Sequence, residues 1–241
     1  MKPGLAIALR TAGASAAALL LAAAGWLGYD ALARRPIAKV AFAGQSERVP
    51  AADLARFAAG LRGRPGREVS LPALREAVKR LPWVRECAVR RHFPDAIEIT
   101  IEAYAPLARW DDTRLVSTGG EVFAAEHEGE LPQFTGPEGT AGEMALMWAV
   151  VRRTAAPLGS PVTGLALSER RAWQARLASG LLLDLGRGEV EARLARFAQA
   201  WPLVPADARS ATRADLRYAN GFSLRGIAAP EKKPAAKSRR A

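Results

Sequence analysis

The sequence predicts an α+β protein with a single N-terminal transmembrane helix followed by two domains. The first domain has the order β-α-α-β-β, and the second is a mixed, mostly antiparallel β-domain with two helices. Three observations carry this prediction: an uncharged run rich in Ala and Leu near the N-terminus, clear apolar-polar alternation within residues 96–104, and two segments of helical spacing among short alternating segments in the second half.

The apolar run extends from Thr11 to Tyr29 and would form a helix roughly 28 Å long, close to the ~30 Å hydrocarbon core of a bilayer. We therefore expect a short cytoplasmic head over residues 1–10 and a transmembrane helix over 11–33, with the C-terminal body outside the cytoplasm. Two alternatives stay open, because a cleaved signal peptide and a buried soluble helix share features of this run. Basic residues on its two sides are too balanced to decide the orientation.

Residues 37–105 carry the pattern of one domain. Ser70 is a capping residue for the second of two helices, and Pro82 ends it. Two helices packed on a three-stranded sheet would bury its Ile/Val face. The expected elements are strand Ile37–Phe42, helix Pro50–Leu61, helix Leu71–Arg80, and strands Val84–Arg91 and Ala96–Tyr104.

We expect the β-domain over residues 106–226 and a disordered basic tail over residues 227–241, which are rich in Pro, Ala and Lys. Helical spacing marks Glu143–Ala156 and Val190–Trp201, and Ser179-Gly180 predicts a hairpin turn. The expected strands are Leu107–Trp110, Leu115–Ser117, Val122-Phe123, Val162–Leu167, Ala172–Ala178, Leu181–Leu185, Arg213–Tyr218 and Gly221–Arg225.

The composition argues against several classes of function. Much of the net charge of +11 lies in the terminal segments, so a solvated basic face is favoured over nucleic-acid binding. The single cysteine, Cys87, lies in a run of alternating apolar residues, and we expect it to be a small core residue. His92 and His127 lack metal-ligand spacing, and we expect His92 to be a hydrogen-bonded turn residue. Gly186-Arg187-Gly188 lacks the residues of a phosphate loop, and we expect it to form a hairpin-to-helix turn. We expect no enzyme, no cofactor and no metal.

The last strand suggests a way to bind a partner. Phe222 to Arg225 end the folded region, so this strand is expected at a sheet edge, where its free N–H and C=O groups could accept a strand from another protein. A protected terminal edge that binds nothing is the alternative.

An ordered set of short motifs across residues 37–225 resembles the FtsQ/DivIB family of bacterial cell-division proteins, which carry a POTRA domain followed by a β-domain. No single motif decides this, but their order is specific. The matching segments are Leu81-Pro82-Trp83-Val84, His92-Phe93-Pro94-Asp95, Glu102–Trp110, Asp112–Phe123, Gly136–Gly139, Arg170–Gln174, Leu185–Gly188, Arg193–Phe197 and Asp215–Tyr218.

The resemblance implies a non-enzymatic inner-membrane scaffold of the divisome, enriched at the septum, with a periplasmic body. It would recruit the small bitopic proteins FtsB and FtsL by β-strand augmentation, and other divisome proteins through the POTRA domain, near Arg56–Arg62 and Ala96–Tyr104. The implied partner-binding residues are Arg170, Arg217, Tyr218 and Gly221 from matching motifs, with Asn220, Phe222, Ser223 and Leu224 from alignment to the strand.

The sequence departs from the family pattern in two places. The head before the apolar run is short, and Gly226 stands where a family member may carry an aromatic residue, so Phe222 is expected to compensate on the partner side. Two other classes stay open: a POTRA-bearing envelope protein that assists polypeptide translocation or outer-membrane assembly, and a membrane-tethered hydrolase. No long alternating strands follow Arg225, which argues against the first class.

Overall fold

The computed structural model describes residues 18–32 and 35–226, which fall into two compact units divided between Tyr104 and Ala105. Residues 18–32 form a helix. Among the described residues, no helix combines the length and the apolar character that a membrane span requires. The predicted span begins at Thr11 and thus lies partly outside the described residues, so it stays a prediction.

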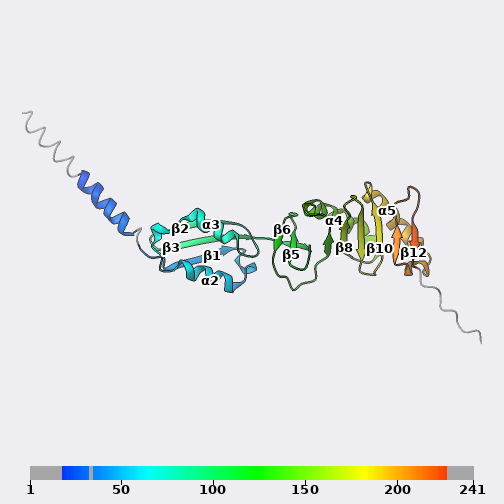
Figure 1. The fold of residues 1–241 in the computed structure, drawn as a ribbon, viewed down its shortest axis with the longest axis horizontal. Coiled ribbons are helices and arrows are strands. Elements are labelled where there is room, and N and C mark those ends of the chain that lie inside the picture. The colour runs from blue at the N-terminus through cyan, green and yellow to red at the C-terminus, as the bar shows by residue number, and fades with distance from the viewer. Residues whose placement is uncertain (1–17, 33–34, 227–241) are drawn as a thin grey trace, which may run out of the picture. The chain divides into compact units, whose positions relative to one another are not determined.

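The first unit has the predicted order of elements. Its sheet has the strand order β1-β3-β2, with β1 parallel and β2 antiparallel to the central strand β3, and Figure 1 shows α2 and α3 beside it. Ser70 caps α3 by accepting a hydrogen bond from the N–H of Ala73. The bounds are β1 Lys39–Gly44, α2 Ala51–Leu61, α3 Leu71–Lys79, β2 Val84–His92 and β3 Ala96–Ala103.

The core of the first unit forms where alternate residues of β3 face the helices. Ile97, Ile99 and Ile101 are almost completely buried, and Cys87 joins the same cluster. The sequence predicted Cys87 as a core residue, and this prediction is confirmed. Burial of the Cys87 thiol raises its pKa, which keeps the sulfur protonated and unreactive.

The second unit is built on a nine-stranded sheet in the order β12-β11-β10-β9-β8-β7-β4-β5-β6. Five of its pairings are antiparallel and three are parallel, so it is mixed and mostly antiparallel, as predicted. The strands are β4 Pro106–Arg109, β5 Arg114–Ser117, β6 Val122–Ala124, β7 Gln133–Thr135, β8 Val162–Leu167, β9 Trp173–Leu177, β10 Leu182–Gly186, β11 Arg213–Asp215 and β12 Ser223–Arg225.

Two helices, α4 (Ala141–Ala155) and α5 (Val190–Ala200), pack with this sheet around one core. Met144 and Val151 of α4 and Leu194 and Phe197 of α5 are almost completely buried in it. The core extends to β12, because the half-buried side chains of Phe222 and Leu224 pack against it. Both predicted helices are therefore present, each ending within one residue of its expected C-terminus.

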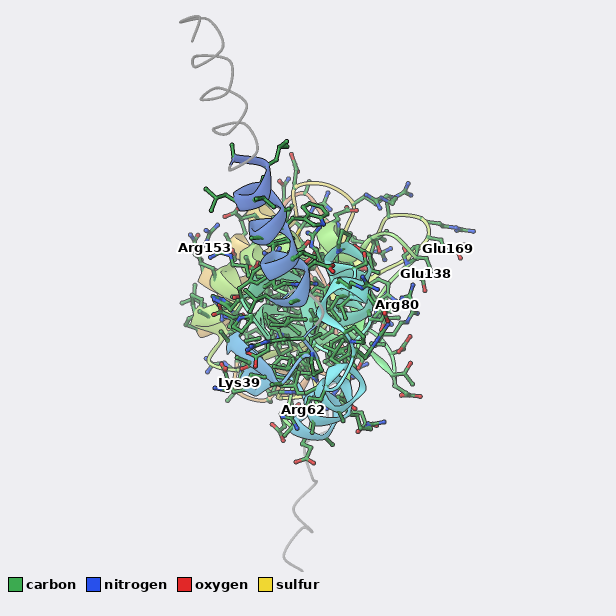
Figure 2. All side chains as sticks on the ribbon, turned by 90° about the vertical axis from the view of Figure 1, so that its left-hand side faces the viewer. Lys39, Arg62, Arg80, Glu138, Arg153 and Glu169 are labelled. Atoms are coloured by element: carbon green, nitrogen blue, oxygen red, sulfur yellow. The ribbon has the colours of Figure 1, made fainter. Side chains whose placement is uncertain are left out.

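Three details differ from the expected strands. β7 was not predicted, although Phe134 at its centre is fully buried. β11 and β12 are three residues long, shorter than expected, because the chain leaves β11 after Asp215 and enters β12 only at Ser223. The charged side chains of Arg62 and Arg153 lie on the outside of their units, as Figure 2 shows.

Candidate partner-binding site at the β12 edge

β12 is the edge strand of the nine-stranded sheet, as the sequence predicted, with β11 as its neighbour. Backbone hydrogen bonds show which groups of β11 face which strand. Leu182 N–H donates to Thr212 C=O, and Leu216 N–H donates to Asp184 C=O, both at 2.9 Å. The C=O of Thr212 and the N–H of Leu216 therefore face β10, and the backbone groups of Arg213 and Asp215 face β12. The N–H of Thr212 also donates to β12, to the C=O of Arg225 at 3.1 Å.

Arg213 and Asp215 pair with Arg225 and Ser223. Since backbone groups alternate in direction along an antiparallel pair, the N–H and C=O of Leu224 point away from β11. The open edge thus offers one donor and one acceptor at Leu224, while the Leu224 side chain packs on the core.

Tyr218 lies in the connection between β11 and β12 and is 51% exposed, one of few large apolar side chains so exposed in the second unit. An exposed tyrosine beside an open edge combines a rigid aromatic surface with a hydroxyl group, a combination that is enriched at protein interfaces.

Arg170 and Arg217, which are 47 residues apart in sequence, line the same hollow of about 410 Å³. Arg187 and Arg193 also line it, and the sequence analysis did not single out these two arginines as binding residues. Arg170 forms no ion pair with any carboxylate of the described residues. A hollow with four guanidinium groups is suited to carboxylate groups, which can be bound bidentately.

The absence of a side chain at Gly186 leaves room for Arg217 and Arg193 to line this hollow. The Gly186 φ of +74° lies in the left-handed region, and a Cβ there would lie 2.9 Å from Cγ of Arg217 and 3.0 Å from Nη1 of Arg193. Arg193 holds the turn by donating from Nη1 to the C=O of Leu185 (3.1 Å) and of Arg187 (3.2 Å). The turn leads from the β9–β10 hairpin into α5, in agreement with the hairpin-to-helix turn predicted for Gly186-Arg187-Gly188.

Arg217 is oriented by Asp215. Its Nε and Nη2 donate to the two carboxylate oxygens at 2.8 and 2.7 Å, and its backbone N–H donates to the same side chain. Chiefly because of the Arg217 side chain, the pKa of Asp215 is lowered to about 2. Arg217 remains 63% exposed, so its outer face is free to meet a partner although the pair with Asp215 fixes its position.

Asn220, Gly221 and Phe222 line a second hollow of about 320 Å³, together with residues of α5, and Arg193 lines both hollows. The Phe222 ring packs edge-to-face on Phe197, with ring centroids 4.9 Å apart. Phe222 therefore stabilises its own turn, which limits the surface it can offer in compensation for Gly226.

Ser223 and Gly226 complete the edge. Every buried side-chain polar atom in the part of the chain that the structure describes has a hydrogen-bond partner except Ser223 Oγ. Gly226 has a φ of +69°, and a Cβ there would collide with Oγ1 of Thr212, so a side chain at this position would be strained and would displace Thr212. The glycine is explained by this close approach.

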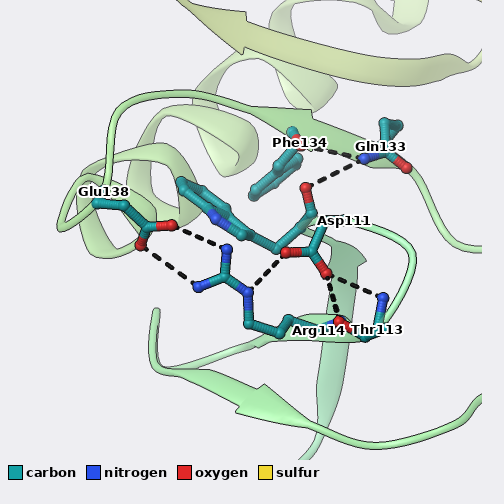
Figure 3. Close-up of polar contacts among 7 residues, drawn as sticks. Asp111, Thr113, Arg114, Gln133, Phe134 and Glu138 are labelled. Atoms are coloured by element: carbon teal, nitrogen blue, oxygen red, sulfur yellow. Dashed lines mark hydrogen bonds and ion pairs between the residues drawn. The ribbon is translucent and has the colours of Figure 1, made fainter.

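Another charged cluster in the second unit is structural. Arg114 bridges Asp111 (Nε–Oδ2 2.6 Å) and Glu138 (Nη2–Oε1 2.8 Å), which ties the β4–β5 turn to the segment before α4 (Figure 3). Both carboxylates of this cluster are bonded to the single guanidinium of Arg114. Within residues 18–32 and 35–226, no three His, Cys, Asp or Glu side chains lie close enough to hold a metal ion.

In the first unit, the strand expected to carry a partner surface is β3, which lies in the centre of its sheet. It therefore has no open backbone edge, and only the face that carries Glu98, Thr100 and Glu102 remains for contact. His92 is bonded to Glu98 (Nε2–Oε2 2.6 Å), in agreement with its prediction as a hydrogen-bonded residue.

Comparisons with known proteins match both units. Residues 35–104 match the family "POTRA domain, FtsQ-type", and residues 108–217 match "Cell division protein FtsQ/DivIB, C-terminal". The cell division protein FtsQ of Bordetella pertussis is 37% identical over 239 residues, covering 86% of this chain and 85% of the relative. FtsQ of Xanthomonas campestris pv. campestris is 33% identical, covering 87% of this chain and 77% of the relative. FtsQ of Escherichia coli is 30% identical, covering 83% of this chain and 75% of the relative. The chain therefore belongs to the FtsQ/DivIB family of cell division proteins and has a role in the divisome.

Proposed function

We propose that this protein is a non-enzymatic inner-membrane scaffold of the divisome, which recruits FtsB/FtsL-like bitopic partners by strand addition at β12. In this proposal its N-terminus is cytoplasmic, one helix crosses the membrane, the two units are periplasmic, and it links early and late steps of septal cell-wall synthesis. The open N–H and C=O of Leu224 at the sheet edge are the observation that carries the proposal.

The size of the edge shows what else binding requires. Two hydrogen bonds at Leu224 contribute about 1–3 kcal/mol, whereas micromolar binding needs about 8 kcal/mol. Strand addition at β12 must therefore act together with side chains. Tyr218 would supply an aromatic anchor, and Arg170 and Arg217 would pair with partner carboxylates in the hollow they share.

A proline tests the role of the backbone directly. Leu224→Pro removes the N–H that faces the open edge but no bond to β11, because that N–H points away from β11. Leu224→Ala is the matched control, since it also shortens the half-buried side chain but keeps the N–H.

Binding of each full-length variant to the soluble domain of FtsB from the same genome is measured by isothermal titration calorimetry. We expect Leu224→Pro to bind about 10-fold more weakly than Leu224→Ala. Equal dissociation constants for the two variants would rule out strand addition at this edge.

A further inference from the structure

The sheet face opposite the core carries two rows of mostly polar side chains that run across β9, β10, β11 and β12. Ala175, Leu183, Ala214 and Leu224 pair in register and lie on the core side. Because side chains alternate between faces, the residues on either side of this register line lie on the opposite face. One row is Gln174, Asp184, Asp215 and Ser223, and the other is Arg176, Leu182, Arg213 and Arg225.

Both carboxylates of the first row already accept hydrogen bonds from other side chains. Asp184 accepts from Arg213 (Nη2–Oδ1 2.9 Å) and from Gln174 (2.6 Å), and Asp215 is occupied by Arg217. Both carboxylate side chains are less than a tenth exposed. Both carboxylates are therefore bonded to other arginines, and Arg225 is attracted to Asp215 without forming an ion pair with it.

Arg225 is exposed, and it forms no ion pair with a carboxylate anywhere in the described ranges. Its cross-strand partner is another cation, Arg213, in the register of β11 and β12. Like charges directly opposite each other in a sheet are unfavourable. Arg225 is therefore a cation at the open edge, with the Arg213–Asp184 ion pair on its inner side and an open position on its outer side.

We propose that Arg225 selects partner strands that carry Asp or Glu at the position directly across from it. This inference rests on the proposed strand addition at β12, and it concerns a residue outside the arginine hollow. An added strand, parallel or antiparallel, places one side chain beside Arg225 on the same face, at the short distance where opposite charges attract. A Lys or Arg there would become the third cation in a row.

The test uses full-length protein and the soluble domain of FtsB from the same genome. Arg225→Glu is compared with Arg152→Glu, which makes the same change of net charge on the exposed surface of α4. We expect binding to weaken about 10-fold with Arg225→Glu and by less than 2-fold with Arg152→Glu. We also expect one Asp→Lys or Glu→Lys substitution in FtsB, tested one at a time, to restore binding to Arg225→Glu.

A second readout separates this role from misfolding. Arg225→Glu places a carboxylate opposite Arg213, and repulsion from Asp215 offsets this attraction, so the melting temperature of the unbound protein should change little while binding falls. Binding of Arg225→Glu equal to that of Arg152→Glu, or the absence of any rescuing substitution, would overturn the inference.

The same measurements distinguish the two proposals. If Leu224→Pro weakens binding relative to Leu224→Ala but Arg225→Glu does not, strand addition stands and charge selection by Arg225 is overturned. If the Leu224 variants bind equally, both proposals are overturned.

Discussion

Gly186→Ala should disturb the arginine hollow far more than Gly188→Ala does. Gly186 and Gly188 both have left-handed backbones, with φ of +74° and +60°. The β-carbon of an alanine costs about 1–2 kcal/mol in this region at either position. The two sites differ in their surroundings, because nothing lies within 4 Å of a Cβ at Gly188, whereas one at Gly186 meets Arg217 and Arg193.

The Cγ of Arg217 is close to its backbone and cannot swing aside as the end of the side chain could. Gly186→Ala should therefore displace Arg217 and break its paired bonds to Asp215, which are 2.8 and 2.7 Å long. Hydrogen bonds to a charged group contribute about 1.5–3 kcal/mol, and the exposure of Arg217 places this pair at the low end. We expect Gly186→Ala to lower the free energy of unfolding by about 1 kcal/mol more than Gly188→Ala.

Urea denaturation of the two variants measures this difference, and calorimetry with the FtsB domain measures its effect on binding. We expect Gly188→Ala to bind as the unmodified protein does and Gly186→Ala to bind about 10-fold more weakly. Equal stability and equal affinity for the two variants would refute the conclusion that Arg217 keeps its position because residue 186 has no side chain.

Two further predictions concern stability. Hydrogen bonds, chiefly from a backbone N–H, lower the pKa of Asp111 to about 2, so its stabilising contribution is present above the ordinary carboxyl pKa and is lost as the pH falls from about 4 toward 2. Asp111→Asn should therefore reduce the fall in melting temperature over this range, with Asp112→Asn as the control, and an unchanged pH profile would contradict it. Glu189 is a non-glycine residue with a φ of +49° at the start of α5, so Glu189→Gly should raise the free energy of unfolding by about 0.5–1 kcal/mol. A lower value in urea denaturation would count against strain at this turn.

The sequence predicted the elements with strong periodicity and missed those held by their surroundings. The alternating residues of β3 and the helical spacing of α5 each reveal a buried face, so both elements were predicted close to their observed bounds. β7 has three residues, too few to display a period, and it exists because its neighbours β4 and β8 flank it. β11 and β12 were predicted too long, since Tyr218 and Phe222, which lie just outside them, are residue types enriched in strands.

The candidate site was predictable only where a local pattern in the sequence indicates it. The terminal position of the last strand pointed to an edge, and family motifs pointed to Arg170 and Arg217. The approach of Gly186 to Arg217 joins residues 31 apart in sequence, and the pairing of Arg213 with Arg225 depends on the register of β11 and β12. Neither contact leaves a local pattern in the sequence.

Hydrogen exchange of single backbone amides, with and without the FtsB domain, tests strand addition at β12 most directly. Leu224 N–H faces the open edge in the free protein, whereas Arg225 N–H faces β11, so binding should slow exchange strongly at Leu224 and little at Arg225. Protection of amides elsewhere in the presence of saturating FtsB, with Leu224 still exchanging at its free rate, would contradict the account.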